Sequence, residues 1–495
     1  MQVLAISVVA LVAGFLVHAV VQVLHDPLWS IRGPFFARWT RLWELIEPGV
    51  PVFSWPAINH LHGSIVRIAP CTYSIADPSV IRPVYGAGSS FTKAPFYYAF
   101  GNPDPPVSDL LADLDNKRHA IKRRKVASLY SISALVNYET AIDTVTEQLC
   151  QRLNQFATSG HAFDFVSWMQ FYAFDVIGEI TVGETFGFIQ AGSDFNGILR
   201  AIHDSMVYGS RIGIIPELHP ILAKITQELR IPIPFDLVGK YLRKHIDTRK
   251  TAGDTSPSPS ATDFLSLLLA QQAQGKLNNT DVLNSLGANI AAGSDTTAIS
   301  LSSFLDYTLR SPETFRRLRD EVDAAMAGKA PGEPISYTEA QEMVFMQACI
   351  KEALRLHPVT GYPLLRVVPE GGAVLAGQYF PGGTQVGINP WVLHRNEDIF
   401  GSDPASFRPE RWLGAKGQVT VMSNHLLTFG SGARTCIGKN ISLLEMSKLI
   451  PQIIRRFDVQ LEHPETEWRT STSWFVKQEF ACSVRQRESL SRDGY

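Results

Sequence analysis

The chain has 495 residues, of which 45% are hydrophobic, and it carries 45 Lys plus Arg against 47 Asp plus Glu. This composition provides enough apolar material for a large core, argues against wholesale disorder and gives no support for a nucleic-acid partner, which usually calls for a strongly basic domain. The five cysteines are far apart and form no CxxC pair, which excludes a disulfide framework and favours a reducing compartment, where a single cysteine is free to act as a thiolate.

Residues 2–24 contain no formally charged side chain. Because about 20 helical residues span the hydrocarbon core of a bilayer, this stretch predicts an N-terminal transmembrane helix. A cleaved signal peptide is the alternative, but no basic residue precedes the stretch and no clear small-residue cleavage site follows it. Arg32, Arg38 and Arg41 come after it, so the positive-inside rule places the rest of the chain in the cytosol.

The pattern downstream of this segment changes several times. Residues 25–60 are rich in Pro and Trp and predict a hinge and entry segment, and strand-like runs follow at 64–68 and 72–75. Residues 116–356 show the apolar spacing of helices, interrupted by a Ser-, Pro- and Gly-rich surface loop at 251–262. After residue 357 short β-like runs dominate. We therefore expect a mainly α fold with a smaller β region, as a single domain over residues 61–495.

Two helical segments carry polar residues at fixed spacing. The stretch LGANIAAGSDTTAISLS at 286–302 contains Asp295 and Thr296, although Ser-Asp-Thr-Thr is also good capping chemistry and a helix N-terminus is the alternative. The stretch CIKEALRLHP at 349–358 places Glu352 and Arg355 at i and i+3, on one helix face. Alone, this ExxR pattern appears in any charged helix. The sequence FRPERW at 407–412 adds Arg411.

A Gly-rich loop around one cysteine gives the most specific signal. Residues 429–438 read FGSGARTCIG, for which a buried free cysteine in a tight turn is the alternative interpretation. Every fixed position matches the FxxGxRxCxG pattern, so the chain resembles the cytochrome P450 family. The phrases RLHPVTGYPLLRVVPEGG and WVLHRNEDIFG are similar to those of filamentous-fungal members of the group around pisatin demethylase.

The resemblance implies a bound haem b with Cys436 as its axial thiolate, which pushes electron density onto the iron. Gly432 and Gly438 then allow a tight turn and a close approach to the porphyrin, and Phe429 packs beside the sulfur. Further implied partners of the haem propionates are Arg434, Arg366, and His119 and Arg123 of the basic stretch 116–125, for which a solvated basic face is the alternative.

The resemblance also assigns roles to the two helical segments. Residues 292–297 match [AG]-G-x-[DE]-T-[TS], where Gly293 lets the helix pass close to oxygen, Asp295 relays protons from solvent and Thr296 hydrogen-bonds the group that receives them. Glu352, Arg355 and Arg411 are implied to form a buried structural triad without catalytic function.

The implied activity is that of a haem-thiolate monooxygenase. The sequence contains no Walker A and no GxGxxG after a strand, so the electrons are expected to come from a separate protein. The resemblance implies that O2 is the oxidant and that this protein is an NADPH-dependent flavoprotein reductase, with a cytochrome b-type protein as a second possible donor. Candidates for its docking face are Lys122, Arg124, Lys125, Lys439 and Lys448, for each of which a plain solvated surface is the alternative. The implied location is the endoplasmic reticulum membrane, with the catalytic domain in the cytosol.

The substrate is expected to be a bulky apolar small molecule that is hydroxylated, epoxidised, O-demethylated or desaturated in fungal secondary metabolism. Pocket candidates are residues 96–114, Asn289, Ile290, 359–365 and 471–475, with the aromatic residues Phe96, Tyr97, Tyr98, Phe100, Tyr362, Trp474 and Phe475. The alternatives are detoxification of plant or other foreign compounds, a haem-thiolate isomerase or dehydratase that needs no reductase, a haem sensor or carrier, and an anchored scaffold without cofactor.

Overall fold

The computed structural model describes residues 26–46, 61–104, 107–251, 263–330, 332–466, 468–472 and 474–487, together with positions 14, 17, 20, 21, 58 and 59. Most of the predicted anchor at 2–24, part of the hinge at 25–60 and nearly all of the loop at 251–262 lie outside the described residues. Among the residues that are described, no helix is both long enough and apolar enough to cross a bilayer.

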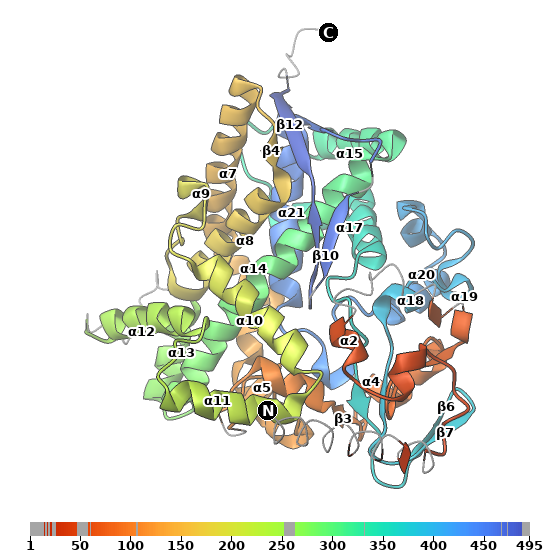
Figure 1. The fold of residues 1–495 in the computed structure, drawn as a ribbon. Coiled ribbons are helices and arrows are strands. Elements are labelled where there is room, and N and C mark those ends of the chain that lie inside the picture. The colour runs from red at the N-terminus through yellow and green to blue at the C-terminus, as the bar shows by residue number, and fades with distance from the viewer. Residues whose placement is uncertain are drawn as a thin grey trace, which may run out of the picture.

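Helices dominate the fold and surround one long central helix (Figure 1). The α-helices are α2 (Trp43–Ile46), α4 (Ile81–Tyr85), α5 (Asn116–Val126), α6 (Ile132–Leu135), α7 (Glu139–Ser159), α8 (Phe165–Val182), α9 (Phe188–Ala191), α10 (Ile198–Ile212), α11 (His219–Glu228), α12 (Asp236–Thr251), α13 (Phe264–Ala273), α14 (Asn279–Leu309), α15 (Pro312–Ala325), α16 (Tyr337–Glu342), α17 (Val344–Leu356), α18 (Pro390–Leu393), α19 (Glu397–Phe400), α20 (Lys416–Asn424) and α21 (Lys439–Arg456). Short 3₁₀ helices are η1 (Phe35–Arg38), η2 (Pro78–Val80), η3 (Pro95–Phe100), η4 (Ala127–Tyr130), η5 (Val136–Tyr138), η6 (Pro216–Leu218), η7 (Pro409–Leu413) and η8 (Gly432–Arg434).

The strands form a smaller β region, as the sequence predicted. They are β1 (Ile65–Ala69), β2 (Thr72–Ile75), β3 (Thr92–Lys93), β4 (Phe163–Asp164), β5 (Arg366–Val367), β6 (Ala373–Leu375), β7 (Gln378–Phe380), β8 (Gln385–Gly387), β9 (Phe457–Leu461), β10 (Arg469–Thr472), β11 (Val476–Glu479) and β12 (Ala481–Gln486). The largest sheet has the order β1-β2-β8-β5-β3, and β2 and β8 are its parallel pair. Because β5 and β3 pair with Arg366 opposite Lys93, two distant segments bring two cations together.

The central helix α14 begins at a capping box in which Asn278 and Asp281 bond each other's backbone N–H groups. It packs along α8, a helix whose side chains are buried almost all round, as expected for an element in the middle of a core. Gly293 lies at this crossing, because an added Cβ would come within 3.0 Å of Ile177 on α8. The missing side chain of Gly293 therefore allows the two helices to approach, and its role beside oxygen stays a prediction.

Candidate active site

The cysteine loop connects η8 to α21 and is closed by a backbone hydrogen bond from the N–H of Cys436 to the carbonyl oxygen of Phe429, at 2.8 Å. Gly432 has a φ of +63°, and a Cβ at this position would lie 1.8 Å from the carbonyl oxygen of Tyr85. Both observations exclude any residue but glycine there. The loop is thereby held against the C-terminal end of α4.

Gly438 does not have the backbone role that the sequence suggested. Its φ of −82° is available to any residue, and no atom of the described residues lies within 4 Å of an added Cβ. The second left-handed glycine of the loop is Gly430, with a φ of +69°. The tight turn therefore depends on Gly430 and Gly432, whereas the open side of Gly438 suits the close approach of a flat group.

The sulfur of Cys436 faces several groups that favour negative charge. Burial by the loop raises the pKa of its thiol, even though part of the residue remains accessible. The backbone N–H groups of Gly438 and Lys439 and the guanidinium of Arg123 oppose this rise. These N–H groups belong to the first turn of α21, where the helix dipole also favours an anion. The donor set fits an anionic sulfur ligand whose electron density is tuned by hydrogen bonds.

Cations gather beside this loop without a carboxylate for each. Burial lowers the pKa of Lys93, and the nearby Arg366 and Arg434 lower it further. Burial lowers the pKa of Arg434 to about 10, and Arg366 adds to this. These cations contact backbone carbonyl oxygens instead: Lys93 that of Leu111 at 2.6 Å, Arg434 that of Asp113 at 2.7 Å, Arg366 that of Leu365 at 2.8 Å and Arg123 that of Thr435 at 2.7 Å. Like charges held together in this way fit a ligand with two carboxylates, such as the propionates of a haem.

His119 is not one of these cations. Burial, followed by repulsion from Arg434, Lys93 and Arg123, lowers the pKa of His119 to about 3. Its imidazole is therefore neutral at physiological pH and can act as a hydrogen-bond donor, so a contact with a propionate would rest on a hydrogen bond and not on charge. Lys93 is the residue that sequence reasoning missed, because only the pairing of β3 with β5 places it beside Arg366.

The acid and alcohol of the central helix lie well inside α14. Asn278 caps the helix, so the alternative of an N-terminus at Ser-Asp-Thr-Thr is wrong. Thr296 donates its hydroxyl to the carbonyl oxygen of Ala292 at 2.8 Å, and both residues keep accessible surface on one helix face. The adjacent Thr297 donates to Ser442 of α21 at 3.1 Å, which ties this turn to the helix that follows the cysteine loop.

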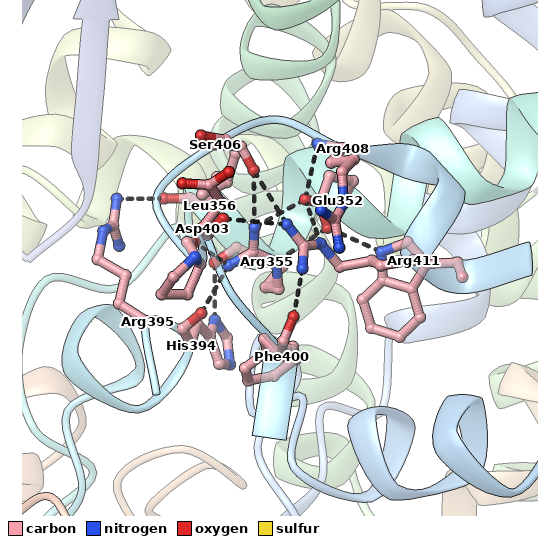
Figure 2. A network of polar contacts seen from close by, with 12 residues as sticks. Glu352, Arg355, Leu356, His394, Arg395, Phe400, Asp403, Ser406, Arg408 and Arg411 are labelled. Carbon is pink, nitrogen blue, oxygen red and sulfur yellow. Dashed lines mark hydrogen bonds and ion pairs between the residues drawn. The ribbon is translucent and has the colours of Figure 1, made fainter. Parts of the chain in front are cut away.

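Glu352, Arg355 and Arg411 meet in a buried network (Figure 2). Arg355 on α17 bonds both carboxylate oxygens of Glu352, at 2.9 and 2.7 Å, and Arg411 of η7 adds a bond of 2.7 Å. Burial raises the pKa of Glu352, but the two guanidiniums outweigh it and the net pKa is below the usual value. The arginines also bond backbone carbonyl oxygens of the segment before η7, among them those of Asp403 and Ser406.

Two further residues complete this network, and neither had been assigned a role. Trp412 stands at the end of the FRPERW stretch and donates its indole N–H to Glu352 at 2.8 Å. His394 bonds the carbonyl oxygen of Arg355 through Nδ1 and accepts the N–H of Leu427 through Nε2, each at 2.8 Å. Because Leu427 lies just before the cysteine loop, His394 connects the loop to the triad. The only sequence signal was its place in WVLHRNEDIFG.

The basic residues proposed for docking separate into different classes. Lys448 is buried, forms ion pairs of 3.0 Å with Glu139 and Asp143, and cannot contact a partner, so that prediction is wrong. Lys122 and Lys125 pair with Asp113 at 3.1 Å and Asp281 at 2.8 Å. Arg124 and Lys439 are exposed. These two remain the best candidates among the five.

Three of the predicted pocket segments contribute aromatic rings to one cluster. Phe96 of η3 stacks on Tyr362 with ring centroids 4.8 Å apart, and Trp474 lies 5.4 Å from Phe96 and 5.0 Å from Phe100. A cavity of about 80 Å³ borders this cluster and is also lined by Glu44, whose pKa burial raises to about 7. The cavity is therefore bordered by aromatic rings on one side and by the carboxyl group of Glu44 on another.

Other predicted pocket residues contact neighbours outside this cluster. Asn289 is buried and accepts a hydrogen bond from Tyr130 at 2.5 Å, and Ile290 belongs to the helical core. Ile290 lies on a different face of α14 from Ala292 and Thr296, whereas Asn289 shares their face and is held there by Tyr130. Tyr98 bonds the carbonyl oxygen of Pro103 at 2.6 Å and packs against His219, away from Trp474.

Comparisons with known proteins agree with this arrangement. Residues 58–482 match the family model described as Cytochrome P450. The chain is 39% identical over 491 residues to a pisatin demethylase of Fusarium vanettenii, covering 98% of this chain and 95% of that protein. It is 33% identical over 481 residues to the cytochrome P450 monooxygenase cicH of Emericella nidulans, covering 94% and 95% of the two chains. The chain therefore belongs to the cytochrome P450 family, as an enzyme of the monooxygenase class.

Proposed function

We propose that this enzyme is a haem-thiolate monooxygenase that uses O2 and electrons from a separate NADPH-dependent reductase to oxidise a bulky apolar molecule. The observation that carries the proposal is the cysteine loop, in which backbone N–H groups approach the sulfur of Cys436 beside a group of buried cations. Cys436 would hold the iron, and Lys93, Arg123, Arg366 and Arg434 would hold the propionates. The haem, when bound, supplies the activation of oxygen.

The remaining residues of the site manage protons and water. The Thr296 hydroxyl stands on the accessible face of α14, where it donates to the carbonyl oxygen of Ala292. When it releases this carbonyl oxygen, it donates a hydrogen bond to the group that receives protons in the reaction. Asp295 takes protons from the solvent side and replenishes those consumed. Phe429, which packs against the helical core, shields the sulfur from water.

The substrate class rests on the aromatic cluster and on the relatives. Rings from η3, from 359–365 and from the segment before β11 favour a flat, largely apolar molecule with a polar edge facing Glu44. The relatives include enzymes named for pisatin demethylation and a monooxygenase of Emericella nidulans. We place the reaction in fungal secondary metabolism. Metabolite profiles with and without the gene test this: a lost product with one more oxygen or two fewer hydrogens supports it, and unchanged profiles favour detoxification.

Replacing Thr296 by Ala tests the reaction class. With a reductase and NADPH, the variant should keep consuming NADPH but release hydrogen peroxide, and product per NADPH should fall by about 10²-fold, the lower end for losing a proton-transfer group. Thr296→Ser should retain most coupling because it keeps the hydroxyl. Thr308→Ala, on the same helix but bonded to Phe304 and Leu305, is the matched control. Unchanged coupling in Thr296→Ala would contradict the role given to this hydroxyl, whereas product formed without NADPH would favour the isomerase alternative.

We also place the enzyme at the endoplasmic reticulum membrane, anchored by residues 2–24. An exposed apolar surface supports this, comprising Phe35 and Phe36 of η1 and Ile221, Ile225, Leu229, Ile231 and Ile233 of α11 and its following loop. The ion pair of Arg41 with Glu217, at 3.1 Å, joins the chain after η1 to the 3₁₀ turn before α11, so the two parts of this surface are connected.

Membrane fractionation of truncated variants checks this location. The full chain should resist extraction by alkaline carbonate, whereas residues 25–495 should bind membranes loosely through the apolar surface. Adding Ile225→Glu to the truncated protein should release it into the soluble fraction, because a charge in the interface is costly. Val374→Glu, at an equally apolar exposed position on β6, serves as control and should have no effect. Extraction of the full chain by carbonate would contradict the anchor.

A further inference from the structure

A half-buried carboxyl group stands in the wall of the cavity beside the aromatic cluster. Glu44 belongs to the short helix α2, which is tied to β1 by a hydrogen bond of 2.6 Å from the indole N–H of Trp43 to the carbonyl oxygen of Ile68. One carboxylate oxygen of Glu44 accepts the hydroxyl of Tyr362. Among the described residues, no hydrogen bond reaches its other oxygen. The wall therefore offers a fixed acceptor that is only half used.

The charges around this carboxyl group largely cancel. Arg41, just before α2, donates from both terminal nitrogens to one oxygen of Glu217 of η6, each at 3.1 Å. Tyr362 stays protonated, because burial, followed by repulsion from Glu44, raises its pKa. The other described residues that line the cavity carry no ionisable side chain. Burial raises the pKa of Glu44 to about 7, although the bond from Tyr362 and the charge of Arg41 oppose this rise.

This acceptor calls for a hydrogen-bond donor on the ligand. A carboxylate accepts through both oxygens, and a protonated carboxyl group still accepts through its carbonyl oxygen. Because the pKa of Glu44 is about 7, both forms are present near neutral pH. A hydroxyl group can donate to either form, whereas an ammonium group is matched only by the ionised form and brings a second charge out of water. A neutral hydroxyl therefore suits Glu44 best.

The cavity lies directly beside the group of buried cations. Leu365 lines the cavity, and the next residue is Arg366, one of the cations beside the cysteine loop. Phe96 lines it too, and the ring of the following Tyr97 lies 6.0 Å from the guanidinium of Arg366. The volume of about 80 Å³ is several times the roughly 10–15 Å³ that one water needs. It is thus large enough for the polar end of a ligand whose body lies nearer to the cations.

We propose that Glu44 is a specificity-determining residue that accepts a hydrogen bond from a hydroxyl group, phenolic or alcoholic, at one end of an otherwise apolar aromatic substrate. The hydroxyl end occupies the cavity, and the aromatic body lies along Phe96, whose ring stacks on that of Tyr362 at 4.8 Å. Tyr362 holds the carboxyl group through one oxygen and so presents the other oxygen to the ligand. The inference rests on the proposed function and adds the class of substrate to it.

Equilibrium dialysis of the full-length holoenzyme, without reductase or NADPH, measures this recognition. The probes are 4-phenylphenol and 4-methoxybiphenyl, which share the same two rings but differ in the hydroxyl donor. We expect the wild type to prefer the phenol by about tenfold, the contribution of one hydrogen bond. The preference should rise several-fold from about pH 6 to about pH 8, because ionised Glu44 is the stronger acceptor while the phenol stays neutral.

Three variants separate recognition from a structural role. Glu44→Met should abolish the preference, and Glu44→Gln should keep part of it but lose its pH dependence. Tyr362→Phe should retain the preference, because the carboxyl group remains. Glu179→Met is the matched control and should bind as the wild type does. Glu179 is also a half-buried acid whose pKa burial raises, but it stands on α8 and does not line the cavity.

Three results would overturn the inference: a wild type that binds both probes equally, a preference that survives in Glu44→Met, or an equal loss in Tyr362→Phe and Glu44→Met. Should Glu44→Met fail to fold, Glu44→Gln provides the test, since a preference that still rises with pH in this variant would exclude Glu44 as the acceptor. A wild type that prefers the phenol but oxidises no NADPH with a reductase would overturn the proposed function, and the hydroxyl site would stand.

Discussion

Replacement of Cys436 by Ala should abolish the thiolate-type absorption band of the reduced carbon monoxide complex, together with all NADPH-dependent oxidation. The sulfur of Cys436 lies next to the N–H groups of Gly438 and Lys439 and to Arg123, where an anionic ligand is favoured. An alanine offers no atom that can bind iron. The measurement is the difference spectrum of the reduced protein with and without carbon monoxide, at equal protein concentration.

The other cysteines serve as controls because none can substitute. Burial raises the pKa of Cys150 to about 12 and raises those of Cys349 and Cys482 further, so these thiols stay protonated. Cys71 is exposed at the turn between β1 and β2, with a φ of +56°. Cys71→Ser should therefore leave the spectrum unchanged. A thiolate-type band that survives in Cys436→Ala would show that the iron ligand lies elsewhere in the chain.

The features that the sequence predicts well are those whose partners lie close together along the chain. The cysteine loop is ten consecutive positions, and Glu352 with Arg355 is one helical turn, so pattern alone indicates both. Lys93, His394 and Lys477 were missed because the residue that each lies against is far away in sequence. Lys93 lies opposite Arg366 in the sheet, His394 accepts a hydrogen bond from Leu427, and Lys477 forms an ion pair with Asp295. No local periodicity encodes such a contact.

The wrong predictions have a related cause, since they concern which way a side chain points. Lys448 looks like a surface cation by composition, but Glu139 and Asp143 of α7 draw it into the core. Asn289 precedes Asp295 by less than two helical turns, but its side chain is taken up by a hydrogen bond from Tyr130. The residue type indicates which contacts a side chain can form, and packing decides which neighbour it contacts.

Replacement of Glu352 by Gln should destabilise the protein by about 3–5 kcal/mol, because it leaves the guanidiniums of Arg355 and Arg411 buried without an anion. Haem content should fall with it, since the same network reaches the cysteine loop through His394 and Leu427. Denaturant unfolding at neutral pH measures the free energy, and the haem absorbance per mole of protein measures retention. Glu410→Gln is the control, because Glu410 is half exposed in its pair with Arg317 and should cost about 0–1 kcal/mol.

The pH dependence of stability distinguishes loss of this charge from a general packing defect. The pKa of Glu352 in the folded protein lies below its ordinary value of 4.5, because Arg355 and Arg411 outweigh the effect of burial. Its contribution is therefore fully present above pH 4.5 and is lost as the pH falls through the lower folded value. The stability difference between wild type and Glu352→Gln should then be constant at neutral pH and shrink in acid. A difference that stays constant down to the acid limb would mean that Glu352 stabilises the fold by shape and not by its charge.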